Sequence, residues 1–578
     1  MFLLAARELK NPDYFIIITY FLIMVAIGLY FYRRMRVMKD FFSGSNNITW
    51  WLSGVSFYMS CFSAFGFVVY SALAYEYGWL PITLFWTYIP AALLGGLFFG
   101  IRWRRARLDS PVEYLETRFG ATLRQFSAWQ GLPVKIIDDA LKIVAIGIFL
   151  SSTLGLPLKQ SMIWSAVVIL LYTFMGGLWA VTTTDFIQFI VMLAAILLLF
   201  PLSLHQVGGV REFFQNSPEG FFRLTGGDYN LFYIGCMIFM YSLSMSSVHW
   251  QLIQRYTCVP TERDVRKVSY MVVALCLITP IIMYVPAMAA RQFLPADTMP
   301  KEVYPLLCLQ LLPTGLLGLT IAAMLAATMS MLSSDYNVVA NVMTNDVYRR
   351  FLRPGASQRE LLTAGRIATL ITGLLALGVA LLMVEAGGED LFKNMVQLFS
   401  VFTAPIAFPM ILGILTKKIT NKGSLYGYLA GITTGLILFF ALPKSVQLFG
   451  WEIQKENVIL ISTSSATVLV MIITSLLTAH SPKVKQRVDE FFERLELPLG
   501  KLPGEENLNL TDTSDSAISP FRVVGVAVAA IGVMMLAILP WIENAYALKM
   551  NIFVGGALLI AGIVMFKASM KKTAQSTD

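Results

Sequence analysis

One apolar segment near the middle of the chain, residues 321–348, carries polar side chains at helical spacing. Residues three and four apart share one face of an α-helix. The polar stripe formed in this way comprises Ser330, Ser334, Asn337 and Asn341. Asp335 lies one turn from Met331 on the neighbouring face. A carboxylate and hydroxyls at membrane depth are costly unless they meet a partner, an ion or water. The pattern favours a cation site, and hydrogen bonding between helices is the alternative.

Asp185 is a second candidate, because it begins a predicted span after a glycine pair and three threonines. A carboxylate at the N-terminus of a helix is favourable, so simple capping is one interpretation. The functional interpretation is that Asp185 binds a cation or provides a charge beside one.

A third group of charges lies in the segment from Lys135 to Lys142. Lys135 and Asp139 are four residues apart, as are Asp138 and Lys142, so each pair can be neutralised on one helix face. We expect a salt-bridged turn at the cytoplasmic end of a helix. A gate or a proton relay is the alternative.

The composition is that of a polytopic membrane protein. The 578 residues are 57% hydrophobic and only 14% charged, and the mean hydropathy is +0.67, whereas a soluble protein is nearer a quarter charged. The net charge of +9 comes from short basic clusters between apolar runs, so it does not predict nucleic-acid binding. The chain contains no phosphate-binding loop and no HExxH motif, so we do not expect an ATPase, a protease or another enzyme. We also expect no organic cofactor.

Apolar runs long enough to cross about 30 Å of hydrocarbon predict about fifteen membrane spans. They occur near residues 13–33, 50–75, 80–101, 129–153, 158–178, 183–204, 231–252, 269–290, 315–343, 363–384, 394–415, 425–442, 457–478, 521–541 and 550–568. We expect the protein to lie in the plasma membrane. Each basic cluster follows an odd-numbered span, and basic clusters favour the cytoplasmic side, so the N-terminus is expected outside and the C-terminus in the cytoplasm.

The spans group into a main body and two terminal additions. The predicted parts are an extra N-terminal span with its loop (1–49), a first five-helix repeat (50–204), an extracellular loop (205–230), a second five-helix repeat (231–416), additional spans (417–480), a cytoplasmic amphipathic helix and linker (481–520), and two C-terminal spans with a tail (521–578). Within the linker region, residues 484–495 predict a charged helix along the membrane surface.

The first helix of each repeat is rich in small polar residues, with the sequences SFYMSCFSAFG (56–66) and YSLSMSSVHWQ (241–251). In transporters built from inverted repeats, the corresponding helices are broken near the middle of the membrane. We therefore predict a break in both helices. Close helix packing by small residues is the alternative for each helix taken alone.

Five stretches in chain order resemble motifs of the sodium:solute symporter family, over about residues 13–480. They are SPVEYLETRFG (110–120), GGLWAVTTTDFIQ (176–188), Gln254-Arg255, the segment from Ala327 to Tyr348, and GILTKKITNKG (413–423). The resemblance implies an all-α membrane protein whose ten-helix core has two inverted repeats of the leucine-transporter type. It also implies alternating access, with Na⁺ as the coupling ion and a small organic molecule as the solute.

The resemblance also implies two cation sites. The main Na⁺ site would use the carbonyls of Met59, Phe62 and Ala327 together with the hydroxyl of Ser330. The family's next ligand is a hydroxyl residue, and Met331 takes that position, where a thioether is a poor Na⁺ ligand. The second site would use Asp185, Ser333 and Ser334. We hypothesise that Asp335 supplies the oxygen that Met331 lacks, directly or through water, or that it carries a proton.

The resemblance places the solute between the broken helices and the second and tenth core helices. The residues that would face it are Ser63, Gly66, Phe85, Tyr88, His249, Trp250, Gln251 and Gln397. The family's sugar carriers have glutamine and glutamate where this chain has Gly66 and Phe85, so no solute is assigned. The alternatives to sodium-coupled symport are a proton-coupled or cation-independent transporter of the same fold, and a non-transporting sensor or a channel.

Overall fold

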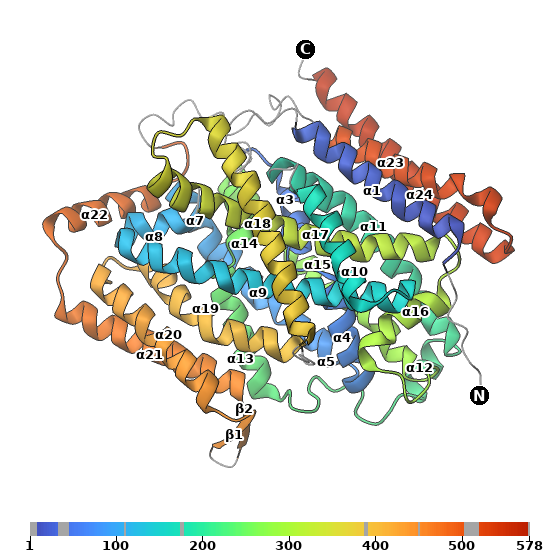
Figure 1. Cartoon of the computed structure of the whole chain (residues 1–578), viewed down its shortest axis with the longest axis horizontal. Helices are drawn as coiled ribbons and strands as arrows, with labels where there is room; N and C mark the ends of the chain where they lie inside the picture. Colours follow the sequence, from blue (N-terminus) through green and yellow to red (C-terminus); the bar gives the residue numbers. More distant parts are fainter. Residues whose placement is uncertain are drawn as a thin grey trace.

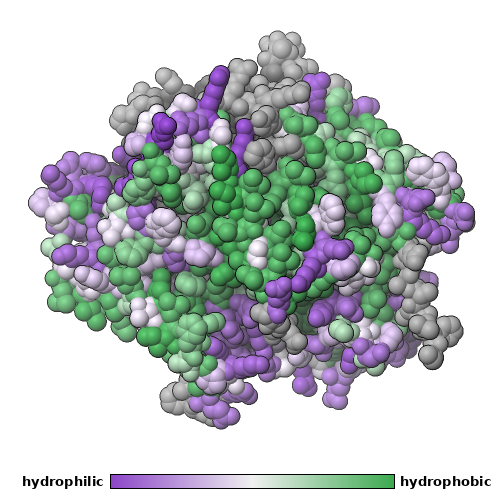
Figure 2. Space-filling view, viewed as in Figure 1, coloured by the Kyte–Doolittle hydropathy of each residue, from purple (hydrophilic) through white to green (hydrophobic). Residues whose placement is uncertain are grey.

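The computed structural model describes residues 9–32, 46–108, 111–173, 178–385, 391–448, 451–501 and 520–575. These residues form a helical body with one small β-hairpin (Figure 1). Twelve single helices within the described ranges are long and apolar enough to cross a membrane, and two bent helix pairs raise the number to at most 14. The protein is therefore an integral multi-pass membrane protein, with slightly fewer spans than the predicted total of about fifteen. Figure 2 shows a broad hydrophobic area across the middle of one face, with hydrophilic side chains gathered toward its edges.

The first half of the core begins with the predicted broken helix. Helices α3 and α4 meet at an angle of 57°, and residues 60–63 between them are not helical. The hydroxyl of Ser63 caps α4 by accepting a hydrogen bond from the Phe65 amide, at 3.3 Å. The elements of this half are α3 (Trp50–Met59), α4 (Ala64–Tyr77), α5 (Leu80–Trp86), α6 (Tyr88–Leu93), η2 (Leu94–Gly100), α7 (Ile101–Ala106), α8 (Pro111–Phe119), α9 (Ala121–Leu154), α10 (Leu158–Thr173) and α11 (Leu178–Gln206).

The second half repeats this arrangement with its own broken helix. A π-helical turn, η3, ends at Val248, and His249 interrupts the helix with φ −76° and ψ 85° before α14 begins. Both predicted breaks are therefore present. The elements are α12 (Val210–Gln215) in the preceding loop, α13 (Leu231–Leu243), η3 (Ser244–Val248), α14 (Trp250–Thr257), α15 (Glu262–Ala290), η4 (Pro300–Glu302), α16 (Val303–Leu311), α17 (Leu316–Val342), η5 (Met343–Leu352), α18 (Gln358–Glu385) and α19 (Leu391–Leu415).

Three terminal helices pack together along one side of the core: α1 (Asn11–Tyr32), α23 (Pro520–Ala537) and α24 (Ala545–Gln575), with the short turn η6 (Leu539–Trp541) between the last two (Figure 1). The carboxylate of Asp13 on α1 accepts hydrogen bonds from the amides of Gly315 and Gly318, at 2.7 and 2.9 Å. Asn551 on α24 donates to the carbonyl of Thr314, at 2.9 Å. Because these amides lie at the start of α17, the terminal helices fix the end of the helix that carries the polar stripe.

The remaining elements, drawn in orange, lie on the opposite side of the view in Figure 1 from α1, α23 and α24. They are α20 (Asn421–Ala441), the antiparallel strands β1 (Ser445–Leu448) and β2 (Trp451–Gln454), α21 (Lys455–Leu477) and α22 (Pro482–Glu496). Helix α22 matches the predicted amphipathic helix, and its buried residues Val488, Phe491, Phe492 and Leu495 show that the apolar face covers protein. Arg107 donates to the carbonyls of Arg494 and Pro498 and so ties α22 to α7. Residues 502–519 of the predicted linker lie outside the described ranges.

Candidate functional site

A central cavity with about 710 Å³ of empty space lies where the two broken helices meet. It brings together most of the residues predicted to face the solute, namely Ser63, Gly66, Phe85, Tyr88, His249 and Gln251. Trp250 faces a neighbouring cavity instead. Gln397 interacts with Glu456 on α21, and its helix neighbours Met395 and Phe399 line the central cavity in its place. The helical spacing explains this displacement, because residues two positions apart point to different sides of α19.

Aromatic side chains form a wall of the central cavity. The rings of Tyr88 and Tyr241 stack with their centroids 4.2 Å apart. Phe85 lies 5.2 Å from Tyr88 and 5.9 Å from Phe62 between ring centroids. Such contacting rings make a rigid apolar surface whose faces carry partial negative charge. The sequence did not predict Phe62 or Tyr241 as wall residues, because only their partners in space distinguish them from other membrane aromatics.

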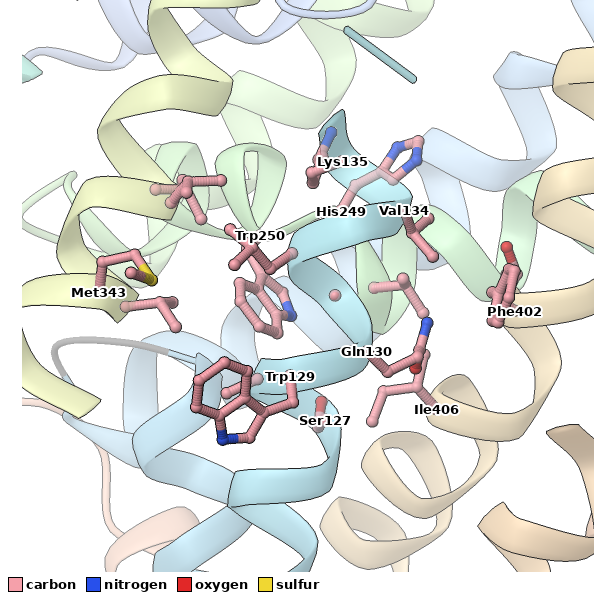
Figure 3. Close-up of a pocket in the computed structure, with 18 of the residues that line it drawn as sticks. Ser127, Trp129, Gln130, Val134, Lys135, His249, Trp250, Met343, Phe402 and Ile406 are labelled. Atoms are coloured by element: carbon pink, nitrogen blue, oxygen red, sulfur yellow. The ribbon is translucent and has the colours of Figure 1, made fainter. Parts of the chain in front are cut away.

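A second cavity, with about 920 Å³ of empty space, adjoins the first along α9 and α17 (Figure 3). Figure 3 shows Trp129 and Trp250 on one side of it and Phe402 and Ile406 on the other. His249 and Phe399 line both cavities, and their ring centroids are 5.6 Å apart. This pair of rings therefore separates the central cavity from the second one.

The predicted main cation site lies between the α3–α4 break and α17. The hydroxyls of Ser60 and Ser334 share a hydrogen bond at 3.3 Å, and the Ala64 amide donates to Thr328 Oγ1 at 3.0 Å. These bonds hold the break, with Met59 and Phe62 on it, against the α17 segment that carries Ala327 and Ser330. Met331 does not point at this place, because its side chain lines the central cavity.

At the predicted second cation site, a guanidinium group already faces the carboxylate. Arg255 Nη2 lies 3.6 Å from Asp185 Oδ2, and both side chains are fully buried. Arg255 also donates to Ser56 Oγ and to Ser334 Oγ, each at 2.8 Å, and Ser56 donates to Asp185. Ser330 Oγ lies near the same carboxylate but has no hydrogen-bond partner among the described residues, whereas Ser333 donates to the Ser330 carbonyl at 3.0 Å.

The position of Asp185 in α11 differs from the sequence prediction. The capping interpretation is wrong, because α11 begins at Leu178 and Asp185 lies two turns inside the helix. The Gly176-Gly177 pair that suggested a helix start lies outside the described residues. In the sequence, Arg255 stood out only as part of a motif, and no local pattern marked Ser56 as a partner of Asp185.

Four buried charges and the partly buried Lys135 form a separate cluster between α9 and α17. Lys142 Nζ lies 2.9 Å from Asp138, 2.9 Å from Asp139 and 2.6 Å from Asp335. Lys135 Nζ lies 3.2 Å from Asp138 and 2.7 Å from Asp335. The predicted Asp138–Lys142 pair is confirmed, but Lys135 pairs with Asp138 and Asp335 rather than with Asp139. The predicted salt-bridged turn at a helix end is wrong, because these residues lie inside α9 and their partner comes from α17.

The cluster also bears on the hypothesis for Asp335. Each of its carboxylate oxygens contacts a lysine, Oδ1 with Lys135 and Oδ2 with Lys142. Both Asp335 oxygens therefore contact lysines, and neither is free to replace the oxygen ligand that Met331 lacks at the predicted main Na⁺ site.

Several known proteins are similar to this chain. A sodium/sialic acid symporter, NanT, of Aliivibrio fischeri is 26% identical over 458 residues, which cover 75% of this chain and 88% of that protein. Sodium/myo-inositol cotransporter 2 of Oryctolagus cuniculus is 28% identical over 490 residues, with 75% of this chain and 70% of that protein covered. A solved structure of a Na⁺-coupled sialic acid symporter, in a substrate-bound outward-open state, matches with a TM-score of 0.71 at 22% identity and covers 81% of this chain and 98% of that one. This match confirms the predicted fold.

The family model for the sodium:solute symporter family matches residues 41–431. The matched region contains both broken helices, the central cavity and the five-charge cluster. It covers more than half of the chain. The chain therefore belongs to the sodium:solute symporter family.

Proposed function

We propose that the central cavity holds the solute of this sodium-coupled symporter and that Na⁺ binds beside it, where the α3–α4 break faces α17. Membership of the family makes the chain a secondary active transporter that couples Na⁺ to a small organic solute. We place the solute in the central cavity because this cavity lies at both helix breaks. Broken helices expose backbone amides and carbonyls at membrane depth, where a solute and an ion can use them.

For the Na⁺ site we propose the carbonyls of Met59, Phe62 and Ala327 with the hydroxyl of Ser330. Na⁺ prefers hard oxygen ligands, and this set adds no net charge to a buried place. Ser330 also interacts with Asp185, which brings a carboxylate near the ion without requiring direct contact. Asp335 has no place in this set, since lysines occupy both of its oxygens.

At the second predicted site, Asp185 with Ser333 and Ser334, we propose that Arg255 serves as a built-in cation. Its guanidinium is 3.6 Å from Asp185 and 2.8 Å from Ser334, so it neutralises the carboxylate that an ion would otherwise need to neutralise. One Na⁺ at the main site is then the coupling ion in this conformation.

For the route of the solute, we propose that the His249–Phe399 pair acts as the partition between the central cavity and a cytoplasmic vestibule. The vestibule is the second cavity, which is lined by Val342, Met343 and Val347 near the basic end of η5, where Arg349 and Arg350 lie. Basic clusters favour the cytoplasmic side of a membrane. Alternating access then requires these two rings to separate while the opposite side closes.

The proposal is tested by filling the central cavity at Gly66. A Cβ atom there would meet only ordinary contacts, the nearest being Phe62 at 3.5 Å, so Gly66→Leu extends into the cavity without displacing backbone. We expect Na⁺-driven solute uptake into proteoliposomes to be abolished. Gly235→Leu is the matched control, because Gly235 has no atom within 4 Å of its added Cβ and is exposed. Uptake by Gly66→Leu at the control's rate would overturn the placement of the solute.

A further inference from the structure

The five-charge cluster, defined as Lys135, Asp138, Asp139, Lys142 and Asp335, contains three carboxylates and two ammonium groups. It therefore carries one more negative charge than the two lysines neutralise. Excess charge in a buried, low-dielectric place is costly and calls for a further positive group. The central cavity reaches this cluster, because Asp138 and Lys142 both line it.

Lys142 is not the group that a solute would use. An ammonium group has three N–H donors, and the three carboxylates at 2.6–2.9 Å occupy all of them. A carboxylate on the solute would have to displace one of these partners and would then meet the other two at close range. The cavity therefore disfavours an anionic group next to Lys142.

Two acceptor atoms, in contrast, remain for a solute. Asp138 Oδ2 accepts from both lysines, while none of the hydrogen bonds among the described residues involves Oδ1. Gln251, which is 1% exposed and also lines the cavity, has its Oε1 atom buried without a hydrogen-bond partner in the described part of the chain. A buried acceptor that lacks a donor costs free energy until a ligand supplies one. Both atoms call for N–H or O–H donors from the solute.

The aromatic wall favours the same kind of ligand. Phe62, Phe85, Tyr88 and Tyr241 line the cavity together with Asp138. Ring faces attract cations, and the attraction strengthens when water is excluded. An aromatic wall beside a carboxylate is thus suited to an alkylammonium group, whose charge meets the carboxylate and whose carbon atoms meet the rings.

We propose that the transported solute carries a protonated amine, with its N–H groups on Asp138 and Gln251 and its carbon skeleton against the aromatic wall. The inference rests on the proposed function, since it assumes that the central cavity is the solute site. The amine supplies the positive charge that the five-charge cluster lacks, so a cationic amine leaves the loaded site neutral, and a zwitterion places its ammonium group on Asp138 with its carboxylate away from the cluster. Cationic amines and zwitterionic amino acids both fit this description.

The test measures Na⁺-dependent thermal stabilisation of the purified full chain by four classes of probe: amino alcohols, neutral amino acids, myo-inositol and N-acetylneuraminate. We expect amine-bearing probes to stabilise the protein and the other two not to do so. Asp138→Asn should weaken amine binding about tenfold or more, equivalent to at least about 1.4 kcal/mol. Glu456→Gln is the matched control, since it removes a buried carboxylate outside both the five-charge cluster and the cavity lining, and we expect at most about a threefold change there.

Each outcome decides between the two claims. Stabilisation by myo-inositol or N-acetylneuraminate but not by any amine overturns the inference and leaves the proposed function standing. Equal losses in Asp138→Asn and Glu456→Gln overturn it. An altered Na⁺ or pH dependence of Asp138→Asn without altered amine affinity also overturns it, since an ion or a proton would then supply the charge. The absence of stabilisation by every probe contradicts the proposed solute site itself. If Asp138→Asn does not fold, Gln251→Leu replaces it, with a loss of amine affinity expected and an unchanged affinity contradicting the inference.

Discussion

Arg255 and Asp185 form a fully buried ion pair, with Arg255 Nη2 3.6 Å from Asp185 Oδ2. The two residues belong to different halves of the core, α14 and α11. Ser56 on α3 and Ser334 on α17 hydrogen-bond to the same guanidinium. Four helices from both halves of the core therefore meet at one charged group.

Replacing Arg255 tests its role as a built-in cation. In Arg255→Gln, Asp185 is left without its buried partner, which costs about 3–5 kcal/mol of stability. We expect Na⁺ to stabilise the variant more strongly than the wild type, because the carboxylate becomes available to an ion. Thermal unfolding in NaCl and in KCl measures both effects. Arg105→Gln is the control, since its pair with Glu262 is partly exposed and worth about 0–1 kcal/mol. Equal Na⁺ responses in the wild type and Arg255→Gln would contradict the proposed role.

Ser330 is the side chain on which the proposed Na⁺ site depends. Removing the hydroxyl in Ser330→Ala should weaken Na⁺ binding by about 1–3 kcal/mol, or roughly tenfold or more in affinity. The Na⁺ concentration that gives half-maximal thermal stabilisation reports this change. Ser161→Ala on α10 removes an equally buried hydroxyl that belongs to neither predicted cation site, and it should leave the Na⁺ affinity as it is. A Ser330→Ala protein with wild-type Na⁺ affinity would exclude this hydroxyl as a ligand.

Phe399 should limit the passage of Na⁺ between the central cavity and the second cavity when no solute is bound. Phe399→Ala removes one of the two rings that line both cavities, so we expect Na⁺ to cross the membrane without solute. The measurement is ²²Na⁺ uptake into proteoliposomes in the absence of any solute. Phe402→Ala is the control, because Phe402 lines only the second cavity. A leak of the same size in both variants would show that the loss of a ring, rather than the partition, causes it.

A pH effect is expected at Glu116 on α8, outside the spans. Partial burial raises its pKa, but hydrogen bonds from Arg350 and Arg124 outweigh this, so the pKa lies below its ordinary value of 4.5. Because the pKa is lowered on folding, the ion pairs stabilise the protein above that ordinary value, and the contribution is lost as pH falls through the folded-state pKa. About a third of the Glu116 side chain is exposed, so we expect no more than about 1 kcal/mol. Thermal unfolding between pH 3 and 7 should show this loss in the wild type but not in Glu116→Gln, and identical pH profiles would contradict it.

The sequence predicted those features of the fold that depend on neighbouring residues. The two helix breaks were predictable because serines gather in SFYMSCFSAFG and YSLSMSSVHWQ, and both breaks are present. Residues close in sequence to the breaks, such as Gly66 and Gln251, line the cavity as predicted by resemblance. Local pattern was sufficient in these cases because the break itself positions the adjacent residues.

The misplaced features depend on partners far away in the chain. Asp335 and Lys142 are 193 residues apart, so helical spacing gave no reason to connect them. Local spacing favoured Lys135 with Asp139, but a buried lysine pairs with whichever carboxylate the packing of α9 against α17 presents. Asp185 was misjudged for a related reason, because capping depends on the residue at which α11 starts, and helix ends are poorly defined by apolar pattern.

The most direct test of the whole account is solute accumulation driven only by a Na⁺ gradient. Proteoliposomes that contain the full chain are loaded with KCl and diluted into NaCl, with a mixture of amine-bearing solutes outside, and the contents are analysed by mass spectrometry. The account predicts that at least one solute accumulates above its external concentration, and that accumulation stops when KCl replaces NaCl outside or when Gly66→Leu replaces the wild type. Accumulation that continues in Na⁺-free buffer, or that survives Gly66→Leu, would contradict it.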